Sequence, residues 1–429
     1  MASRIEEAIS VIKKNDRGGY TVPTNRLYPY QWNWDSGFTA LGIWHFSKWR
    51  AWMEIISLLD AQWKDGMVPH IVFRRNDPDY FPGPDVWKTN TDPPSSGHSQ
   101  PPVLASIVLK MVRMGSNYDQ KKAREVFPRL MSYHRWFINN RDPKKTGIIG
   151  IIHPWESGRD NCPDWDIGLK NVSIPADLMS YKRRDTSHVD VNQRPTKEQY
   201  DKFVSIVEFG QKTGWNHKLI HAEGPFLMAD PGVQFILLRA NKDLLELAHL
   251  LQLKDQMDEI ESWIARLQLG CEWLWNESIG SYCARDIKTG VFSNATTNAS
   301  MLSFFAGAGS KEQMQSMSEH CHRILSACNY GMPSWDPHHV EFESKRYWRG
   351  PVWLVMNYMI ATGLEDSGEN TLAERIRNDT YRLVENHGMA EYFDPLDGTG
   401  LGGIDFSWTA AIYLNQCNGE VAEILNQKE

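Results

Sequence analysis

Residues 233–274, VQFILLRANKDLLELAHLLQLKDQMDEIESWIARLQLGCEWL, decide the fold class. Their apolar positions recur every three to four residues in two runs: Val233, Ile236, Leu237, Ala240 and Leu244, then Met257, Ile260, Ile264, Leu267, Cys271 and Leu274. This period is typical of amphipathic helices that bury one face. The stretch therefore predicts two consecutive helices.

Outward from this stretch the same period predicts helices over about 47–63, 102–114, 120–140, 350–363 and 406–416. Ser310 with Gln313, and Thr371 with Glu374, fit the capping-box pattern at the start of two further helices. Alternating strand patterns are limited to short pieces near 68–74 and 147–153, which predict small hairpins. The chain is therefore predicted to be all-α.

Long loops rich in Pro, Gly, Asp and Trp separate the helices, at 20–38, 76–101, 153–175, 330–351 and 391–408. Loops of this length in a compact domain are usually functional. Many helices with functional loops gathered at one end predict an α/α toroid. No low-complexity linker divides the chain, so residues 1–429 are predicted to form one domain.

A polar, lid-like insertion is predicted at about 170–216, and its most polar part is 180–216. Gly210 and Gly214 near its end are the predicted hinges. We expect this segment to cover a site.

Composition narrows the function classes. The 429 residues carry a formal net charge of −7 without a Lys/Arg-rich run, which argues against nucleic acid or an anionic membrane surface as the partner. The first residues lack the apolar segment of a secretory signal, and no window reaches the ~18 consecutive apolar residues of a membrane span. Six cysteines without CxxC spacing predict reduced core residues. A cytoplasmic protein is expected.

Aromatic residues are abundant, with 18 Trp, 15 Tyr and 16 Phe. A Trp ring offers a flat apolar face and one N–H donor, which suits a sugar ring, although most tryptophans are expected to fill the helical core. In residues 28–37, YPYQWNWDSG, aromatics alternate with amides and an acid. This loop is either a sugar-binding wall or a buried aromatic cluster in which Asp35 caps a helix starting at 38.

Residues 153–166, HPWESGRDNCPDWD, hold four acids together with two tryptophans and two prolines. Burial beside Trp raises the pKa of a carboxyl group, which keeps a general acid protonated near neutral pH. The alternative is that these aspartates cap turns. At least one acid is predicted to be functional, and the pattern alone does not choose between Glu156 and Asp160.

In residues 347–353, YWRGPVW, Arg349 lies between aromatic residues. It is either a functional residue or a structural residue that pairs with an acid from another loop. Pro351 suits the first turn of the following helix.

Residues 391–409, EYFDPLDGTGLGGIDFSWT, contain glycines in formal GxGxxG spacing. No strand precedes them and no βαβ unit surrounds them, so a dinucleotide site is rejected. Asp394 and Asp397 do not fit the EF-hand spacing either. A glycine loop that follows Glu391 and leads into a helix favours a flexible active-site wall.

Other cofactor signals are absent from the sequence. His188 and the pair His338 and His339 lack a metal-ligand pattern such as HExxH, so no catalytic metal and no cofactor is predicted.

Together these motifs resemble those of glycoside hydrolase family 63, in particular its small bacterial-type members that act on glucosylglycerate and mannosylglycerate. The matching stretches run in order over nearly the whole chain: NDRGGYTVPT (15–24), YPYQWNWDSGF (28–38), GHSQPPVLA (97–105), HPWESGRDN (153–161), YWRGPVW (347–353) and EYFDPLDGTGLGGIDFSWTA (391–410). YWRGPVW and the glycine loop are shared with trehalase-like relatives and do not define the substrate.

The resemblance implies an (α/α)6 barrel with the active site in long loops at one end, and inversion at the anomeric carbon. It implies that Asp160 is the general acid and Glu391 the general base. An inverting pair stands roughly 6.5–9.5 Å apart to admit a water molecule.

For substrate binding the resemblance implies Trp32, Trp34 and Asp35 as sugar contacts, Tyr347 and Trp348 as residues closing the site, and Gln100 of the GHSQ stretch as a further contact. Arg194 in the lid-like insertion would hold the glycerate carboxylate by two hydrogen bonds, with Tyr28 and Tyr80 as helpers. His98 departs from the apolar residue expected there, and if it reaches the aglycone pocket the acceptor group differs.

The expected activity is hydrolysis of 2-O-α-D-glucosyl-D-glycerate, 2-O-α-D-mannosyl-D-glycerate or both. The alternative keeps the inverting chemistry on a neutral disaccharide of the kojibiose or trehalose type. A non-catalytic sugar-binding or scaffold protein is disfavoured because both Asp160 and Glu391 are present, and an epimerase or lyase would normally use His. A small-molecule glycoside is the expected partner, without nucleic acid or membrane.

Overall fold

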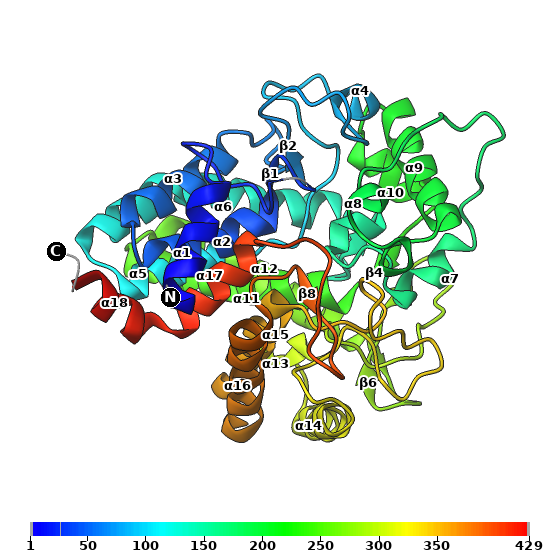
Figure 1. Cartoon of the computed structure of the whole chain (residues 1–429). Helices are drawn as coiled ribbons and strands as arrows, with labels where there is room; N and C mark the ends of the chain where they lie inside the picture. Colours follow the sequence, from blue (N-terminus) through cyan, green and yellow to red (C-terminus); the bar gives the residue numbers. More distant parts are fainter. Residues whose placement is uncertain (1–2, 26, 427–429) are drawn as a thin grey trace.

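Helices alternate between an inner and an outer ring in the computed structural model, which describes residues 3–25 and 27–426 (Figure 1). The inner ring consists of α2 (Asn33–Trp44), α5 (Leu104–Met114), α11 (Pro231–Leu250), α13 (Leu302–Ala306), α15 (Leu354–Asp366) and α17 (Ser407–Gln416). Each of these helices packs against the next, and α17 packs against α2 to close the ring.

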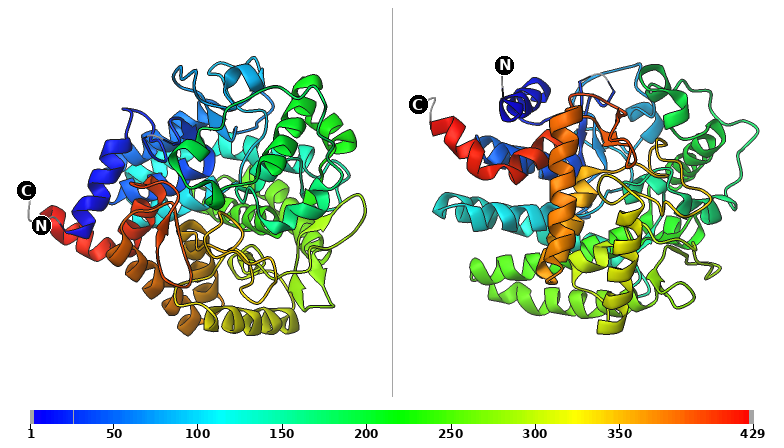
Figure 2. Two further views of the ribbon diagram at one scale, coloured as in Figure 1. Left: turned by 45° about the vertical axis from the view of Figure 1, so that its right-hand side comes forward. Right: turned by 60° about the horizontal axis from the view of Figure 1, so that its bottom comes forward.

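The outer ring supplies a partner next to each inner helix along the chain. It consists of α1 (Arg4–Asn15), α3 (Lys48–Leu59), α6 (Asn117–Asn140), α12 (Met257–Glu272), α14 (Lys311–Ser326) and α16 (Asn370–His387). Helix α3 packs on α2, α12 on α11 and α16 on α15, while α1 lies against α17 (Figure 2). This alternation is the predicted (α/α)6 barrel.

The burial of the two rings explains their sequence patterns. Helix α2 is buried at every position from Asn33 to Ile43, and α17 at every position from Ser407 to Leu414. Helix α16 buries only one face, which recurs every three to four residues. Helices α2 and α17 are therefore buried on all sides over these residues, whereas the outer helix α16 is amphipathic.

Two glycines let inner helices approach closely. A Cβ on Gly42 of α2 would lie 2.4 Å from the Ala411 Cα of α17, and a Cβ on Gly363 of α15 would lie 2.1 Å from the Phe305 nitrogen of α13. Only the absence of a side chain permits both contacts.

Short strands join the loops, and the predicted local hairpins at 68–74 and 147–153 are wrong. Strand β2 (Ile71–Val72) pairs antiparallel with the distant β1 (Gln31–Trp32), and β3 (Gly150–Ile151) pairs with β4 (Met228–Ala229), which also pairs with β7 (Arg285–Asp286). Two hairpins do occur, β5 (Trp275–Asn276) with β6 (Ser281–Tyr282) and β8 (Tyr392–Phe393) with β9 (Gly400–Leu401).

Helix starts agree with the sequence in part. Ser310 forms the predicted capping box with Gln313 at α14. The capping box predicted at Thr371 is wrong, because α16 begins at Asn370 and its first turn has no side-chain cap. Helix α2 begins at Asn33, so Asp35 lies in its first turn, and Pro351 precedes α15 rather than opening it.

The segment predicted as a lid contains α8 (Asp185–His188), η3 (Val191–Gln193) and α9 (Lys197–Lys212), followed by α10 (His217–Glu223). It lies beside α4 (Pro84–Trp87), and the Trp215 indole donates to the Trp87 carbonyl oxygen at 2.7 Å (Figure 1). Gly210, a predicted hinge, lies inside α9, where a Cβ would meet the Trp215 ring at 2.4 Å. Close packing therefore explains this glycine.

The remaining helical elements are short: η1 (Pro154–Ser157), η2 (Pro163–Trp165), α7 (Asp166–Leu169), η4 (Lys254–Gln256) and α18 (Asn418–Asn426). All six cysteines are buried and free, as predicted. Among the described residues, no helix is long and apolar enough to span a bilayer.

Candidate active site

A cavity opens where the loops that precede the inner helices meet, and its empty space, together with the solvent at its open mouth, measures about 870 Å³. Every site residue predicted from the sequence lines it: Tyr28, Trp32, Trp34, Asp35, Tyr80, Gln100, Asp160, Arg194, Tyr347, Trp348 and Glu391.

Asp160 enters the cavity from the turn that follows η1. Gly158 ends η1 with φ +71°, and a Cβ there would lie 2.6 Å from the Trp34 ring, so the glycine lets the chain turn against the aromatic wall. The pKa of Asp160 is raised to about 7, chiefly by burial and to a smaller extent by the nearby Glu391, against the opposing charge of Arg194. Asp160 can therefore hold a proton near neutral pH.

Glu156, the other acid that the sequence left open, does not line the cavity. Arg141 donates to it from Nη2 at 2.7 Å and from Nε at 2.9 Å, and both side chains are fully buried. The Ile152 nitrogen donates to the same carboxylate at 3.1 Å. Glu156 thus holds the loop in place as one half of a buried ion pair.

Further ionic contacts fix the loop of Asp160 from behind. The Arg159 guanidinium donates to Asp164 at 2.9 Å and to Asp230 at 2.7 Å, and Asp230 also caps α11. Arg349 pairs with Asp166 at 3.2 Å, which makes it a structural residue. Asn161 accepts a hydrogen bond from the Trp348 nitrogen at 2.9 Å. The acid loop and residues 347–353 are thereby joined.

Glu391 stands at the entrance to β8, and the glycine loop wraps around it. Its Oε2 accepts from the Gly403 nitrogen at 2.8 Å, and its Oε1 accepts from the Tyr28 hydroxyl at 3.0 Å. Gly402 has φ +73°, and a Cβ there would lie 2.5 Å from Oε2. Burial raises the pKa of Glu391, and the Arg194 charge and these hydrogen bonds oppose the rise.

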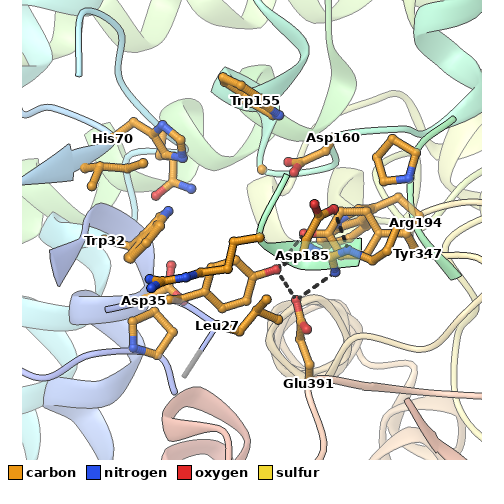
Figure 3. Close-up of a pocket in the computed structure, with 18 of the residues that line it drawn as sticks. Leu27, Trp32, Asp35, His70, Trp155, Asp160, Asp185, Arg194, Tyr347 and Glu391 are labelled. Atoms are coloured by element: carbon orange, nitrogen blue, oxygen red, sulfur yellow. Dashed lines mark hydrogen bonds and ion pairs between the residues drawn. The ribbon is translucent and has the colours of Figure 1, made fainter. Parts of the chain in front are cut away.

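Arg194 reaches the cavity from the lid-like insertion (Figure 3). It is 3% exposed, donates from Nη2 to the Tyr28 hydroxyl at 2.6 Å, and donates from Nε to Asp185 at 3.1 Å. Its guanidinium lies 4.0 Å from the centre of the Tyr347 ring. Its Nη1 is buried without a hydrogen-bond partner and stands 3.7 Å from Oε1 of Glu391. Arg194 therefore has donor capacity left for an anionic ligand.

Aromatic rings form much of the remaining wall. The Trp348 ring stacks on Trp353 with centroids 3.8 Å apart, and Trp34 lies 6.2 Å from Trp348. Tyr347 has the unusual φ of +40°, and its hydroxyl lies 3.3 Å from that of Tyr28. Flat apolar faces beside carboxyl groups suit a sugar ring.

Asp35 and Gln100 complete the polar lining. Asp35 is buried, and burial raises its pKa well above the ordinary value, with smaller contributions from Glu391 and Asp160. The Gln100 side chain accepts from the Trp34 nitrogen at 3.2 Å and so fixes the first turn of α2.

Several lining residues were not singled out in the sequence: His70, Trp155, Arg184, Asp185 and Trp408. Asp185 lies in the polar stretch 180–216, and its role as the partner of Arg194 had no sequence signal. His98 does not line the cavity. It is stacked between His70 and His153, at 4.8 and 5.1 Å, so the idea that it reaches the aglycone pocket is wrong.

Known proteins resemble this chain over nearly its whole length. The family model of the mannosylglycerate hydrolase MGH1-like glycoside hydrolase domain matches residues 28–409. A mannosylglycerate hydrolase from Thermus thermophilus is 44% identical over 95% of this chain and 99% of its own. A glucosylglycerate hydrolase from Mycolicibacterium hassiacum is 31% identical over 95% of this chain and 96% of its own.

A solved structure agrees with the fold. The crystal structure of the family 63 mannosylglycerate hydrolase from Thermus thermophilus in complex with Tris and D-glycerate aligns with a TM-score of 0.92 at 42% identity, covering 96% of this chain and 99% of that one. The chain therefore belongs to the mannosylglycerate hydrolase MGH1-like enzymes of glycoside hydrolase family 63.

Proposed function

We propose that this enzyme is an inverting α-glycosidase that hydrolyses 2-O-α-D-mannosyl-D-glycerate, 2-O-α-D-glucosyl-D-glycerate or both to the hexose and D-glycerate. The observation that carries the proposal is one cavity that holds Asp160, Glu391 and a buried arginine with an unpartnered Nη1. Relatives named for both substrates match almost the full chain, and one relative was crystallised with D-glycerate.

In this proposal Asp160 is the general acid. Its pKa of about 7 leaves it about half protonated at neutral pH and largely protonated at lower pH. It donates that proton to the glycosidic oxygen as the bond to the anomeric carbon breaks, and the glycerate leaves with a neutral hydroxyl group.

Glu391 is the proposed general base. Its Tyr28 and Gly403 hydrogen bonds favour the ionised carboxylate. It accepts a proton from a water molecule that attacks the anomeric carbon on the face opposite the leaving group, and the product has the inverted β configuration.

Arg194 is the proposed receptor for the glycerate carboxylate. Its Nη1 makes no hydrogen bond, although it lies 3.7 Å from Oε1 of Glu391, and its contacts to Asp185 and Tyr28 hold the guanidinium in place. A planar guanidinium binds a carboxylate with charge-assisted hydrogen bonds that a neutral aglycone does not provide. Trp32, Trp34, Asp35, Tyr80, Gln100 and Trp348 would contact the remainder of the substrate.

We also propose that residues 1–429 act as one catalytic domain and that residues 170–216 form a lid. Residue Arg194 connects the two ideas, because it belongs to this segment and is buried in the cavity wall.

Proton NMR of the enzyme acting on mannosylglycerate, glucosylglycerate, trehalose and kojibiose tests the proposal. We expect early appearance of the β-anomer from at least one glycerate substrate. Asp160→Asn and Glu391→Gln serve as controls, each with a loss of turnover of about 10²-fold or more. Activity on the neutral disaccharides alone would overturn the substrate, and an initial α-anomer would overturn the stereochemistry.

A further inference from the structure

Two arginines and two carboxylates alternate beside the proposed base. Arg183 donates to Asp185 from Nε at 3.0 Å and from Nη2 at 2.6 Å. Arg194 stands between Asp185 and Glu391: its Nε donates to Asp185 at 3.1 Å, and its Nη1 lies 3.7 Å from Oε1 of Glu391 (Figure 3). Two positive charges therefore balance two negative charges at this wall of the cavity.

Arg194 supplies positive charge to Glu391 by two routes. Its Nη1 faces Oε1 directly, and its Nη2 donates at 2.6 Å to the Tyr28 hydroxyl, which itself donates to Oε1 at 3.0 Å. Arg194 is 3% exposed and Glu391 is 1% exposed, so salt and solvent screen this interaction little. In the free enzyme the guanidinium therefore stabilises the ionised form of Glu391.

A substrate carboxylate would upset this balance. It would bring a third negative charge to the guanidinium that already faces Asp185 and Glu391. An excess negative charge in a buried site favours uptake of a proton, because burial and a nearby like charge both disfavour an ionised carboxyl group. Arg194 and Arg183 hold the pKa of Asp185 at about 2 against the effect of its burial, so Asp185 stays ionised. Glu391 is the neighbour that can respond.

The other titratable groups around Glu391 are less able to take up this proton. Asp160 has a pKa of about 7 and is already largely protonated at mildly acidic pH. Burial raises the pKa of Asp35 well above its ordinary value, which favours its neutral form. Burial also raises the pKa of the three nearby phenols and keeps them neutral: Tyr28, Tyr347 and Tyr392.

We propose that Arg194 couples the charge of the substrate to the strength of the base: the glycerate carboxylate draws the guanidinium charge away from Glu391, which becomes a stronger base only when a carboxylate-bearing substrate is bound. The inference rests on the base and receptor roles proposed above. A stronger base accepts a proton from the attacking water more readily. A neutral disaccharide leaves the contact between Arg194 and Glu391 unchanged, so the enzyme selects for charge in kcat as well as in KM.

Isothermal titration calorimetry with D-glycerate tests this coupling without turnover. Titrations at about pH 5.5, below the pKa of Asp160, in two buffers of different ionisation enthalpy give the number of protons taken up per bound ligand. We expect an uptake of about 0.5 proton or more by the unmodified enzyme, because binding raises the pKa of Glu391. Glu391→Gln should abolish the uptake and, at about pH 7, bind D-glycerate about tenfold more tightly, since the competing carboxylate is gone.

Two further variants serve as controls. Asp160→Asn should keep the proton uptake, because the proton goes to Glu391. Arg113→Gln also removes one positive charge, but Arg113 pairs with Glu246 and does not line this cavity, so this change should alter neither the uptake nor the affinity.

Binding without proton uptake, or an uptake that persists unchanged in Glu391→Gln, would overturn the coupling and leave the proposed activity intact. Weaker D-glycerate binding by Glu391→Gln would also overturn it. Absence of D-glycerate binding to the unmodified enzyme would instead overturn the proposed receptor role of Arg194, and the coupling with it.

Discussion

Arg141 and Glu156 form an ion pair in which both side chains are completely buried. Nη2 and Nε of Arg141 donate to the Glu156 carboxylate at 2.7 and 2.9 Å. The pair lies behind the loop that carries Asp160. It shows how two acids four residues apart are assigned to different tasks, one to the scaffold and the other to the cavity.

Removal of this buried charge should destabilise the fold. Glu156→Gln leaves the Arg141 guanidinium buried without its counter-charge, and we expect a loss of about 3–5 kcal/mol in the free energy of unfolding. Urea unfolding monitored by Trp fluorescence measures it. Glu246→Gln, which breaks the exposed pair with Arg113, is the control and should cost about 1 kcal/mol or less. Equal effects of the two changes would contradict this prediction.

The rate should depend on pH with two limbs. Turnover needs Asp160 protonated, so kcat/KM should fall as pH rises through about 7. It also needs Glu391 ionised, so kcat/KM should fall on the acid side, below a pKa that burial raises above the ordinary value. A pH series with mannosylglycerate measures both limbs. A rate that stays constant well above pH 7 would contradict the assignment of Asp160.

Asp160→Asn should stabilise the protein in a pH-dependent way. The folded-state pKa of Asp160 is raised above its unfolded value, so its contribution to stability is fully present below about pH 4 and is lost as pH rises through about 7. Asn does not ionise and escapes this loss. The Tm of the variant relative to the unmodified enzyme should therefore increase by a few degrees as pH rises across this window, and calorimetry measures it. A constant difference at every pH would contradict the raised pKa.

Arg194→Ala should discriminate between substrates by their charge. Loss of the guanidinium should raise KM for mannosylglycerate by about 10²-fold, since a charge-assisted hydrogen-bond pair is worth about 3 kcal/mol. Arg194→Lys keeps the charge without the planar fork and should fall in between. Steady-state kinetics on glycerate and neutral glycosides measures the effect. An equal rise in KM for both classes would contradict a role in carboxylate binding.

The helices of the barrel were predictable from the sequence, because a helix that buries one face carries apolar residues every three to four positions, as in α11 and α12. The loops of the site were also predictable, since acids and glycines stood beside Trp in long connections. The choice between Glu156 and Asp160 was not predictable from the sequence, because it depends on the ion pair of Glu156 with Arg141, which lies outside residues 153–166. The pairing of β2 with β1 was equally hidden, since two-residue strands have no pattern that names a distant partner.

The contacts that close the ring also determine when the barrel can be completed during synthesis. Asn15, at the end of α1, donates to the carbonyl oxygen of Asp405, 390 residues later, and to the Ser407 hydroxyl that begins α17. A nascent chain that has not yet released α17 from the ribosome leaves one flank of α2 unpaired, with apolar surface exposed. Glu391 emerges shortly before α17. Helix α1 can therefore make its contacts to α17, and the toroid can close, only after α17 has been synthesised.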